Sequence, residues 1–319
     1  MRQRAFGKFG EVSALALGGA GVASHWGAVA RDEGVATLRE AVARGVTFLD
    51  MAPKYGDLRA EQMVGEAFDG RRPSGVRVLT KVLFDPDEAE FERALETSLA
   101  ASLARMRLQQ VDFLLLHNQV VPDHRAGVWP GVAWTVFAER IRPLLVGLVR
   151  DGRVAGWGLS GIGAASQILR ALDADSPPDV IEAIANPLDL LGNLHTFDES
   201  PRPRDIIARA DQVGTAVLGV RVAAAGALTS ALDRTLPADH PVAVDFARAN
   251  GFRAVATKLA MTPALLALRY VLGMPGVASV VLGVKNRVEL DESLDAEQAG
   301  PLDEDIRRLV DASAIGAPG

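Results

Sequence analysis

The sequence predicts a (β/α)8 TIM barrel, and three observations lead to this prediction. Eight short apolar runs alternate with longer helical patterns along the 319 residues. The runs are almost continuously hydrophobic, as expected for parallel strands that helices cover on both faces. The chain length suits one barrel of roughly 250 residues with additions. We therefore expect residues 1–319 to form a single α/β domain.

The predicted strands are spaced regularly along the chain. They are residues 14–18, 46–50, 77–81, 112–117, 154–160, 180–184, 216–220 and 278–283. Helical periodicity fills the intervals between them. The clearest example is the stripe of Phe91, Leu95, Leu99 and Leu103, which repeats every four residues and predicts an amphipathic helix.

Glycines and prolines mark the element boundaries. Arg44-Gly45, Asp151-Gly152 and Val213-Gly214 are typical of helix ends, because glycine adopts the left-handed conformation that closes a helix. Asp85-Pro86 and Thr262-Pro263 are typical of helix starts, with a capping side chain before a proline at the first helical position.

Three segments lie outside the alternation. Residues 2–13 carry several charges before the first strand, and we expect a hairpin that closes the bottom of the barrel. Residues 118–137 and 229–250 are long excursions after the fourth and seventh strands. Long loops in compact domains are usually functional or disordered.

Composition excludes several classes of function. A net charge of −6 and a pI near 5.5 disfavour a nucleic-acid surface, which needs clustered cations. The absence of cysteine excludes disulfides and thiolate metal sites. The longest apolar stretch, residues 213–228, is interrupted by Arg221, so no membrane span is predicted. Glu11 and the following glycines disfavour a signal peptide, and we expect a cytoplasmic protein of undetermined oligomeric state.

Polar residues stand where three consecutive predicted strands end. Asp50 ends the second strand, Lys81 the third and His117 the fourth, and Tyr55 lies in the loop after the second. In a barrel the carboxyl ends of all strands lie on one face, where active sites are found. Each residue alone is unremarkable as a cap or loop residue. Together they predict a catalytic site.

These four side chains suit proton transfer to an oxygen atom. A free phenol, with a pKa of about 10, is a poor acid at neutral pH. A lysine ammonium about 4 Å away contributes roughly 4 kcal/mol, or about three pK units, which would bring the Tyr55 pKa towards neutrality against the opposing effect of desolvation. Asp50 would keep Lys81 charged, and His117 would bind the accepting oxygen. A hydride must come from a cofactor, since no side chain can supply one.

Several segments resemble one known family. FLDMAPKYG, AEQMVGEAF, VLTK, DFLLLH, GRVAGWGLS and VVLGVKNRVELDESL resemble, in order, motifs of the aldo-keto reductases, over residues 11–295. The resemblance implies an NADP(H)-dependent oxidoreductase that interconverts an aldehyde, ketone or sugar carbonyl and the alcohol. It implies Tyr55 as the acid, Asp50 and Lys81 as its partners, and His117 as the residue that orients the substrate.

The resemblance also implies a cofactor site. Its residues, together with Gly19 from the glycine-rich loop after the first strand, are Asp50, Ser160, Glu182, Val220, Arg221, Gly283, Lys285, Asn286, Arg287, Glu289 and Ser293. Lys285 and Arg287 precede a helix N-terminus, which attracts anions, and they favour the 2′-phosphate of NADP(H). Three positions depart from the family pattern: Gly161 replaces an asparagine, Glu182 a glutamine and Val220 an aromatic residue.

The substrate is a small carbonyl or alcohol compound whose identity the sequence does not reveal. Candidate residues for the pocket wall are Trp26, Phe84, Asn118, Trp129 and Trp134. Large aromatic residues are as often simply buried in a core.

Three other functions compete with this interpretation. The glycine string at residues 18–21 suggests a Rossmann dehydrogenase, but Asp50 follows later than the expected 20 or so residues and Lys81 would have no role. A barrel that binds NADP(H) and reports redox state would keep the same residues. A metal hydrolase is disfavoured, because the histidines at 25, 117, 124, 195 and 240 lack ligand-like spacing.

Overall fold

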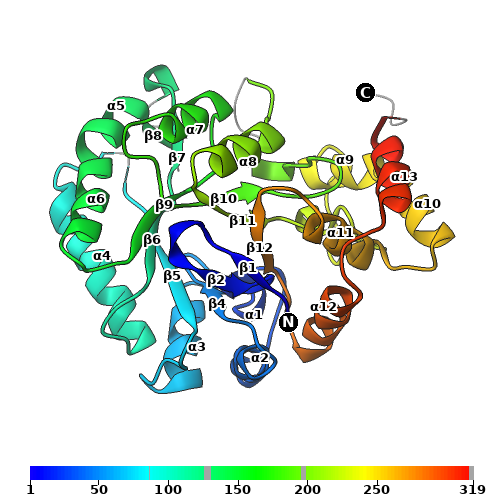
Figure 1. Cartoon of the computed structure of the whole chain (residues 1–319), viewed down its shortest axis with the longest axis horizontal. Coiled ribbons are helices and arrows are strands. Elements are labelled where there is room, and N and C mark those ends of the chain that lie inside the picture. Colours follow the sequence, from blue (N-terminus) through cyan, green and yellow to red (C-terminus); the bar gives the residue numbers. More distant parts are fainter. Residues whose placement is uncertain (86, 126–130, 195–198, 316–319) are drawn as a thin grey trace.

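Eight parallel strands close into a barrel in the computed structural model, which describes residues 1–85, 87–125, 131–194 and 199–315. Around the barrel the order is β10-β11-β12-β3-β4-β5-β6-β9 (Figure 1). The strands are β3 (Leu15–Gly18), β4 (Phe48–Asp50), β5 (Arg77–Val82), β6 (Phe113–Leu116), β9 (Gly156–Ser160), β10 (Val180–Ile184), β11 (Ala216–Val220) and β12 (Val277–Leu282). All eight predicted strands are confirmed, with small shifts at their ends.

Helices surround this barrel (Figure 1). The longer ones are α2 (Arg31–Ala43), α3 (Arg59–Phe68), α4 (Phe91–Met106), α6 (Arg142–Arg150), α7 (Ala165–Leu172), α8 (Pro203–Gln212), α9 (Pro241–Arg248), α10 (Asn250–Lys258), α11 (Pro263–Leu272), α12 (Arg287–Ala299) and α13 (Glu304–Ile315). Short turns of helix occur at α1 (Gly19–Val22) and α5 (Trp134–Val136). The predicted α/β barrel is confirmed.

The predicted helix ends are mostly confirmed. Gly45, Gly152 and Gly214 have positive φ angles of 92°, 70° and 77° after α2, α6 and α8. The Thr262 hydroxyl accepts a hydrogen bond from the Leu265 amide at 3.3 Å and caps α11. These are the local conformations that the turn and cap signals indicate.

The predicted helix start at Asp85 is wrong, because α4 begins only at Phe91. The Asp85 carboxylate instead accepts a hydrogen bond from the Asp87 amide at 3.0 Å, and Glu88 does the same for the Glu90 amide at 2.6 Å. Such local side-chain bonds stabilise turns at the expense of a helix.

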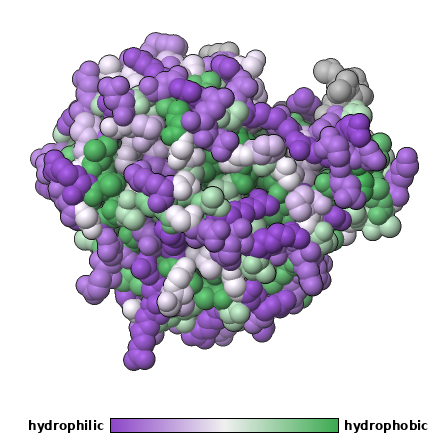
Figure 2. All heavy atoms as spheres, in the orientation of Figure 1, coloured by the Kyte–Doolittle hydropathy of each residue, from purple (hydrophilic) through white to green (hydrophobic). Residues whose placement is uncertain are grey.

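The N-terminal hairpin closes one end of the barrel, as predicted. Strands β1 (Gln3–Ala5) and β2 (Glu11–Ser13) pair antiparallel and cross the barrel end in Figure 1. The buried Phe6 ring lies 5.1 Å from Phe48 and 5.5 Å from Phe113, at the first residues of β4 and β6. Hydrophilic side chains predominate on this face, with small hydrophobic areas between them (Figure 2). The site must therefore open at the opposite end.

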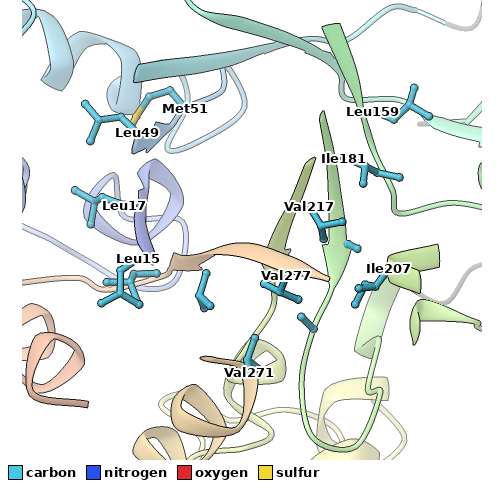
Figure 3. Close-up of a cluster of buried hydrophobic side chains, with 14 of the residues drawn as sticks. Leu15, Leu17, Leu49, Met51, Leu159, Ile181, Ile207, Val217, Val271 and Val277 are labelled. Atoms are coloured by element: carbon cyan, nitrogen blue, oxygen red, sulfur yellow. The ribbon is translucent and has the colours of Figure 1, made fainter. Parts of the chain in front are cut away.

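The core has two parts, because alternate strand residues point to opposite faces. Leu15, Leu17 and Leu49 point outwards towards the helices, where residues such as Ile207 of α8 and Val271 of α11 pack (Figure 3). Ala16, Leu79, Phe113, Leu115 and Leu218 fill the barrel interior. Apolar packing on both faces explains the continuous hydrophobicity of the strands.

The two long excursions contain short elements. Residues 118–137 include β7 (Gln119–Val121) and β8 (Gly131–Ala133), which pair in parallel and lead into α5. Residues 229–250 contain α9 and end where α10 begins. Over the described ranges no single helix is long and apolar enough to cross a membrane, and α10 and α11 pass that test only as a sharply bent pair.

Candidate active site

Lys81 lies at the centre of a buried polar cluster inside the barrel. Its ammonium donates a hydrogen bond to the Tyr55 hydroxyl at 2.9 Å and another to the Met51 carbonyl at 3.2 Å. It also forms an ion pair with Asp50, and it lies 3.1 Å from the Glu182 carboxylate. Asp50, Tyr55 and Lys81, three of the four predicted catalytic residues, thus meet at the Lys81 ammonium.

Glu182 makes this cluster different from a simple ion pair. Its Oε1 atom finds no donor with hydrogen-bond geometry among the described residues, although Lys81 is close. Burial, with Asp50 adding to it, raises the pKa of Glu182 to about 8. Lys81 therefore pairs with Asp50 and lies beside a second carboxyl, Glu182, that mostly keeps its proton at neutral pH. The pKa of Lys81 is raised well above its usual range, because the two carboxyl groups outweigh its burial.

The expectation that the Tyr55 pKa lies towards neutrality is wrong for this structure. Burial is the largest effect and raises the pKa of Tyr55 well above 10. Lys81 lowers the pKa, as expected, but Asp50 and Glu182 raise it further. The sequence argument counted Lys81 and desolvation, and it left out the effect of the two carboxyl groups on Tyr55. The phenol therefore holds its proton throughout the neutral range, with its oxygen fixed by Lys81.

His117 stands beside the phenol. Its ring centroid lies 5.7 Å from that of Tyr55, with the two rings perpendicular. Burial first, then the charges of Lys81 and Lys54, lower the pKa of His117 to about 3. The imidazole is therefore neutral at physiological pH, and a neutral ring has one N–H to donate to an oxygen.

The Tyr55 loop is positioned by a close backbone approach. Gly56 has a φ of 60°, and a Cβ atom there would lie 1.9 Å from the Ala23 carbonyl oxygen. Asp57 and Leu58 also adopt positive φ angles before α3 begins. Arg59 then donates a hydrogen bond to the Ser24 hydroxyl at 3.1 Å, which ties α3 to the first barrel loop. A glycine is thus required directly after Tyr55.

A cavity of about 970 Å³ opens above the cluster. Among the predicted site residues, it is lined by Trp26, Asp50, Tyr55, His117, Ser160, Glu182, Val220, Arg221, Gly283, Lys285, Glu289 and Ser293. It extends from the Lys81 cluster to the N-terminus of α12. Its lining therefore includes both Tyr55 and residues of the first turns of α12.

The glycines of the loop after β3 stand where other segments approach closely. A Cβ atom on Gly19 would lie 2.7 Å from the Met51 sulfur, and one on Gly21 would lie 2.2 Å from the Val284 carbonyl oxygen. Gly19 itself is buried and is not a lining residue of the cavity, whereas its neighbours Gly18 and Ala20 line it. The closed barrel also excludes the Rossmann interpretation.

The departure at Gly161 has a similar steric cause. A Cβ atom at this position would lie 2.3 Å from the Glu182 carbonyl oxygen, which accepts a hydrogen bond from the Gly161 amide at 2.7 Å. Strands β9 and β10 therefore approach too closely here for a larger residue. Of the polar residues expected beside the nicotinamide, Ser160 and Glu182 remain in the cavity.

The cations at the other end of the cavity are already ion-paired. Lys285 lies 3.6 Å from Asp233 and 3.5 Å from Glu289. Arg287 binds Glu33 at 2.9 Å and points away from the cavity lining, contrary to the expectation that it faces the cofactor. Asn286 caps α12 by accepting a hydrogen bond from the Glu289 amide at 2.9 Å.

The expected pocket wall is only partly found. Trp26 lines the cavity, whereas Phe84 and Trp134 are buried in the hydrophobic core outside the barrel. Asn118 is also buried, and it binds the Phe84 backbone through its amide at 2.8 and 2.9 Å. Trp129 lies outside the described residues. Sequence position after a strand does not distinguish a cavity wall from a packed loop.

Several lining residues were missed by the sequence argument. His25, Lys54, Asp233 and Arg234 all border the cavity. His25 follows the first strand in the same way that Tyr55 follows the second, so its position in the chain was an available signal. Among the described residues, no cluster of three or more His, Asp and Glu side chains could hold a metal ion.

Two known proteins are similar to this chain over most of its length. The chain is 26% identical to the L-galactose dehydrogenase of Arabidopsis thaliana over 99% of its length and 94% of the relative. It is 26% identical to a probable voltage-gated potassium channel subunit beta of rice (Oryza sativa subsp. japonica), over 85% of this chain and 83% of that protein.

Two solved structures share the fold. An aldo-keto reductase from Bacillus halodurans, in its holo form, superposes with a TM-score of 0.72 at 20% identity, covering 98% of this chain and 96% of that one. The glycerol dehydrogenase of Gluconobacter oxydans also gives 0.72, at 21% identity, over 99% and 95%. The model of the Aldo/keto reductase family matches residues 14–314. This chain belongs to the aldo/keto reductase family of oxidoreductases, whose members use nicotinamide cofactors.

Proposed function

We propose that this protein is an NADP(H)-dependent oxidoreductase that interconverts an aldehyde, ketone or sugar carbonyl and the corresponding alcohol. The observation that carries the proposal is the hydrogen bond from Lys81 to the Tyr55 hydroxyl at the cavity floor. Because Lys81 donates that bond, the phenol oxygen accepts it and the phenolic hydrogen is free to point at a substrate.

Tyr55 is the proton donor in the direction of carbonyl reduction. When bound, the reduced nicotinamide supplies the hydride that attacks the carbonyl carbon. Tyr55 gives its proton to the carbonyl oxygen, which becomes the alcohol, and Lys81 stabilises the phenolate that remains. The neutral His117 donates a hydrogen bond to the same oxygen and orients the substrate.

The residues present fit a nicotinamide carboxamide despite the departures from the family pattern. A protonated Glu182 offers one donor and one acceptor, much as a glutamine amide does, and its Oε1 atom has no hydrogen-bond donor among the described residues. Ser160 lies on the neighbouring strand in register with Glu182. Val220 provides no ring for stacking, so we expect looser retention of the nicotinamide than an aromatic residue would give.

NADP(H) is the proposed cofactor because Lys285 borders the cavity next to the N-terminus of α12. The helix end and the ammonium both favour an anionic 2′-phosphate. Binding must draw Lys285 from Asp233 and Glu289. This competition makes the preference over NAD(H) modest.

The test is turnover. Wild-type protein is mixed with NADPH or NADH and a panel of aldehydes, ketones and sugars, and cofactor oxidation is followed optically. Oxidation that depends on the carbonyl compound and is faster with NADPH is the expected result. Binding of NADPH without turnover of any substrate would instead favour a redox sensor, the alternative to which the similarity to channel beta subunits also points.

A further inference from the structure

Arg221 is held in an unusual conformation at the cavity. It follows β11 with a φ of 60°, a left-handed conformation that costs a non-glycine residue energy. Its carbonyl oxygen accepts hydrogen bonds from the Asn186 side chain at 3.3 Å and from the Ala224 amide at 2.8 Å, which fix this geometry. The guanidinium lies 4.9 Å from the centre of the Trp26 ring.

The Arg221 guanidinium has no anionic partner among the described residues. Arg105 and Arg204, two other half-buried arginines, pair with Glu61 at 2.7 Å and Asp189 at 2.9 Å. Arg221 has only the Trp26 ring, and burial lowers its pKa to about 10, which leaves it charged at neutral pH. A partly desolvated cation without a counterion is costly unless a ligand supplies the charge.

A row of rings connects Arg221 to the reacting end of the cavity. Trp26 contacts Arg221, His25 packs edge-on against Trp26 at 4.6 Å, and Tyr55 lies 6.2 Å from His25. Arg221, His25 and Tyr55 all line the same cavity. Arg221 therefore faces the space in which the substrate carbonyl must lie.

Arg221 lines this end of the cavity as a cation that no carboxylate among the described residues balances. The carboxyl groups there, Asp50 and Glu182, face Lys81. A negatively charged substrate would meet a favourable potential on its way to Tyr55.

We propose that Arg221 binds an anionic group of the substrate, so that the substrate is a small carbonyl compound with a carboxylate or phosphate a short chain from its reacting carbon. The inference rests on the proposed function and names its substrate class. A guanidinium binds carboxylate and phosphate through two parallel hydrogen bonds, which fixes orientation as well as affinity. Trp26, stacked on the guanidinium, limits the directions from which the anion approaches.

The cofactor diphosphate is the other source of such an oxyanion. Two other cations, Arg234 and Lys285, line the cavity and share Asp233 as a partner. They serve the diphosphate and the adenosine end. The row of rings from Trp26 through His25 to Tyr55 connects Arg221 to the substrate end instead.

Matched substrate pairs test the proposal. Succinic semialdehyde is compared with its methyl ester, and glyceraldehyde 3-phosphate with glyceraldehyde. The wild-type enzyme should prefer the anionic member of at least one pair. Arg221→Met should lower kcat/KM for that member by about 10- to 100-fold, mostly through KM, and change the neutral member by less than about threefold. Arg221→Lys should restore part of the preference.

A matched control separates loss of the anion site from loss of packing. Arg170 lies over the Trp134 ring at 4.1 Å, the same arrangement, away from the cavity lining. Arg170→Met should leave both substrates unchanged. Equal losses for the anionic and neutral members in Arg221→Met would overturn the proposal. The proposal would also be overturned if Arg221→Met weakened NADPH binding and left the ratio of kcat/KM between the anionic and neutral substrates unchanged. That result would assign Arg221 to the cofactor diphosphate.

An anion-binding experiment that needs no turnover tests this inference separately from the proposed function. Succinate and inorganic phosphate are titrated into NADPH-saturated protein, with tryptophan fluorescence as the signal and a Trp26→Phe variant to identify its source. Saturable binding of either anion that Arg221→Met abolishes supports the site even if no aldehyde is reduced. No binding of either anion to the wild type, together with no preference within the substrate pairs, contradicts it.

Discussion

The cavity has a lysine between two carboxyl groups at each of its ends, and the two clusters differ in burial. Lys81 is fully buried between Asp50 and Glu182. The side chain of Lys285 is 30% exposed, between the more exposed Asp233 and Glu289. At about 4 Å, a pair of charges interacts with about 1 kcal/mol in water and about 4 kcal/mol in a partly buried site. The buried Lys81 cluster should thus fix the hydroxyl oxygen of Tyr55, whereas the exposed Lys285 cluster should only adjust the affinity for the cofactor.

The largest effect on kcat is expected for Tyr55, whose hydroxyl the buried cluster holds. Tyr55→Phe removes the proton donor but keeps the ring, so folding and NADPH binding should persist while kcat falls by about two to four orders of magnitude. Steady-state kinetics and cofactor titration measure both quantities. Turnover at the wild-type rate would refute the assigned role.

The other tyrosine of the chain supplies a matched control. Tyr270 is buried in α11, where its hydroxyl donates to Asp311 at 2.5 Å and accepts from Arg204 at 3.1 Å. Tyr270→Phe should lower stability by about 1–3 kcal/mol through those lost bonds and leave kcat unchanged. A fall in kcat equal to that of Tyr55→Phe would mean that the assay reports folding.

The same comparison predicts unequal losses of stability for the two lysines. Lys81→Met leaves buried Asp50 without a counterion and should lower the free energy of unfolding by about 3–5 kcal/mol. Lys285→Met should lower it by less than about 1 kcal/mol, because its partners remain solvated. Denaturant unfolding of both variants makes the comparison.

Coupling within the buried cluster is tested by a double variant. Lys81→Met combined with Asp50→Asn removes both the cation and the carboxylate that it neutralises. The double variant should be less destabilised than the sum of the single variants. Simple additivity would mean that Asp50 and Lys81 do not act as a unit.

Much of this site could be predicted, because it depends on strand ends. Apolar runs locate the strands, and a barrel places their carboxyl ends on one face, so Asp50, Lys81 and His117 had to lie near one another. Tyr55 was predicted from its place in the loop after the second strand. The barrel follows from the same periodicity, and the hairpin was predicted from the charged segment, residues 2–13, that precedes the first strand.

Other features depend on contacts between segments far apart in the chain. Glu182 approaches Lys81 across the barrel interior, and no local pattern indicates that approach. Arg287 is the first residue of α12 and binds Glu33 on another helix, so its place at the helix start was misleading. Phe84 and Trp134 point into the core rather than the cavity for the same reason: strand order gives position, but side-chain direction in loops depends on packing.

Glu182 provides a pH-dependent test of the buried cluster. Its folded-state pKa of about 8 exceeds the ordinary value of 4.5, so the folded protein holds a proton that the unfolded chain releases. The stability that this proton confers is complete below the ordinary pKa and is lost as pH rises through the folded value. Glu182→Gln cannot titrate, so its unfolding free energy should fall by a few kcal/mol less than that of the wild type between about pH 5 and 8.

The control for this experiment is Glu292→Gln, since Glu292 is an exposed carboxylate that lines the same cavity. Its unfolding free energy should follow the wild-type pH dependence. Parallel curves for the wild type and Glu182→Gln, measured by denaturant unfolding without cofactor, would show that Glu182 is ionised in the folded protein.

The smallest effect, a change in cofactor affinity, is expected at the exposed Lys285 cluster. Two neighbouring cations there, Lys285 and Arg287, are expected to behave differently. Lys285 lines the cavity, whereas Arg287 is 55% exposed and binds Glu33 outside it. A charge-assisted contact with a 2′-phosphate is worth roughly 1.5–3 kcal/mol, from which the cost of separating Lys285 from Asp233 and Glu289 is subtracted. Lys285→Met should therefore weaken NADPH binding by about tenfold and leave NADH binding unchanged. Arg287→Met should change neither by more than about twofold, since its charge is already balanced by Glu33. Fluorescence titration of each variant with both cofactors gives the four dissociation constants. If Lys285→Met weakens both cofactors equally, Lys285 contacts a part that they share, and the preference for NADP(H) has no basis in this cluster.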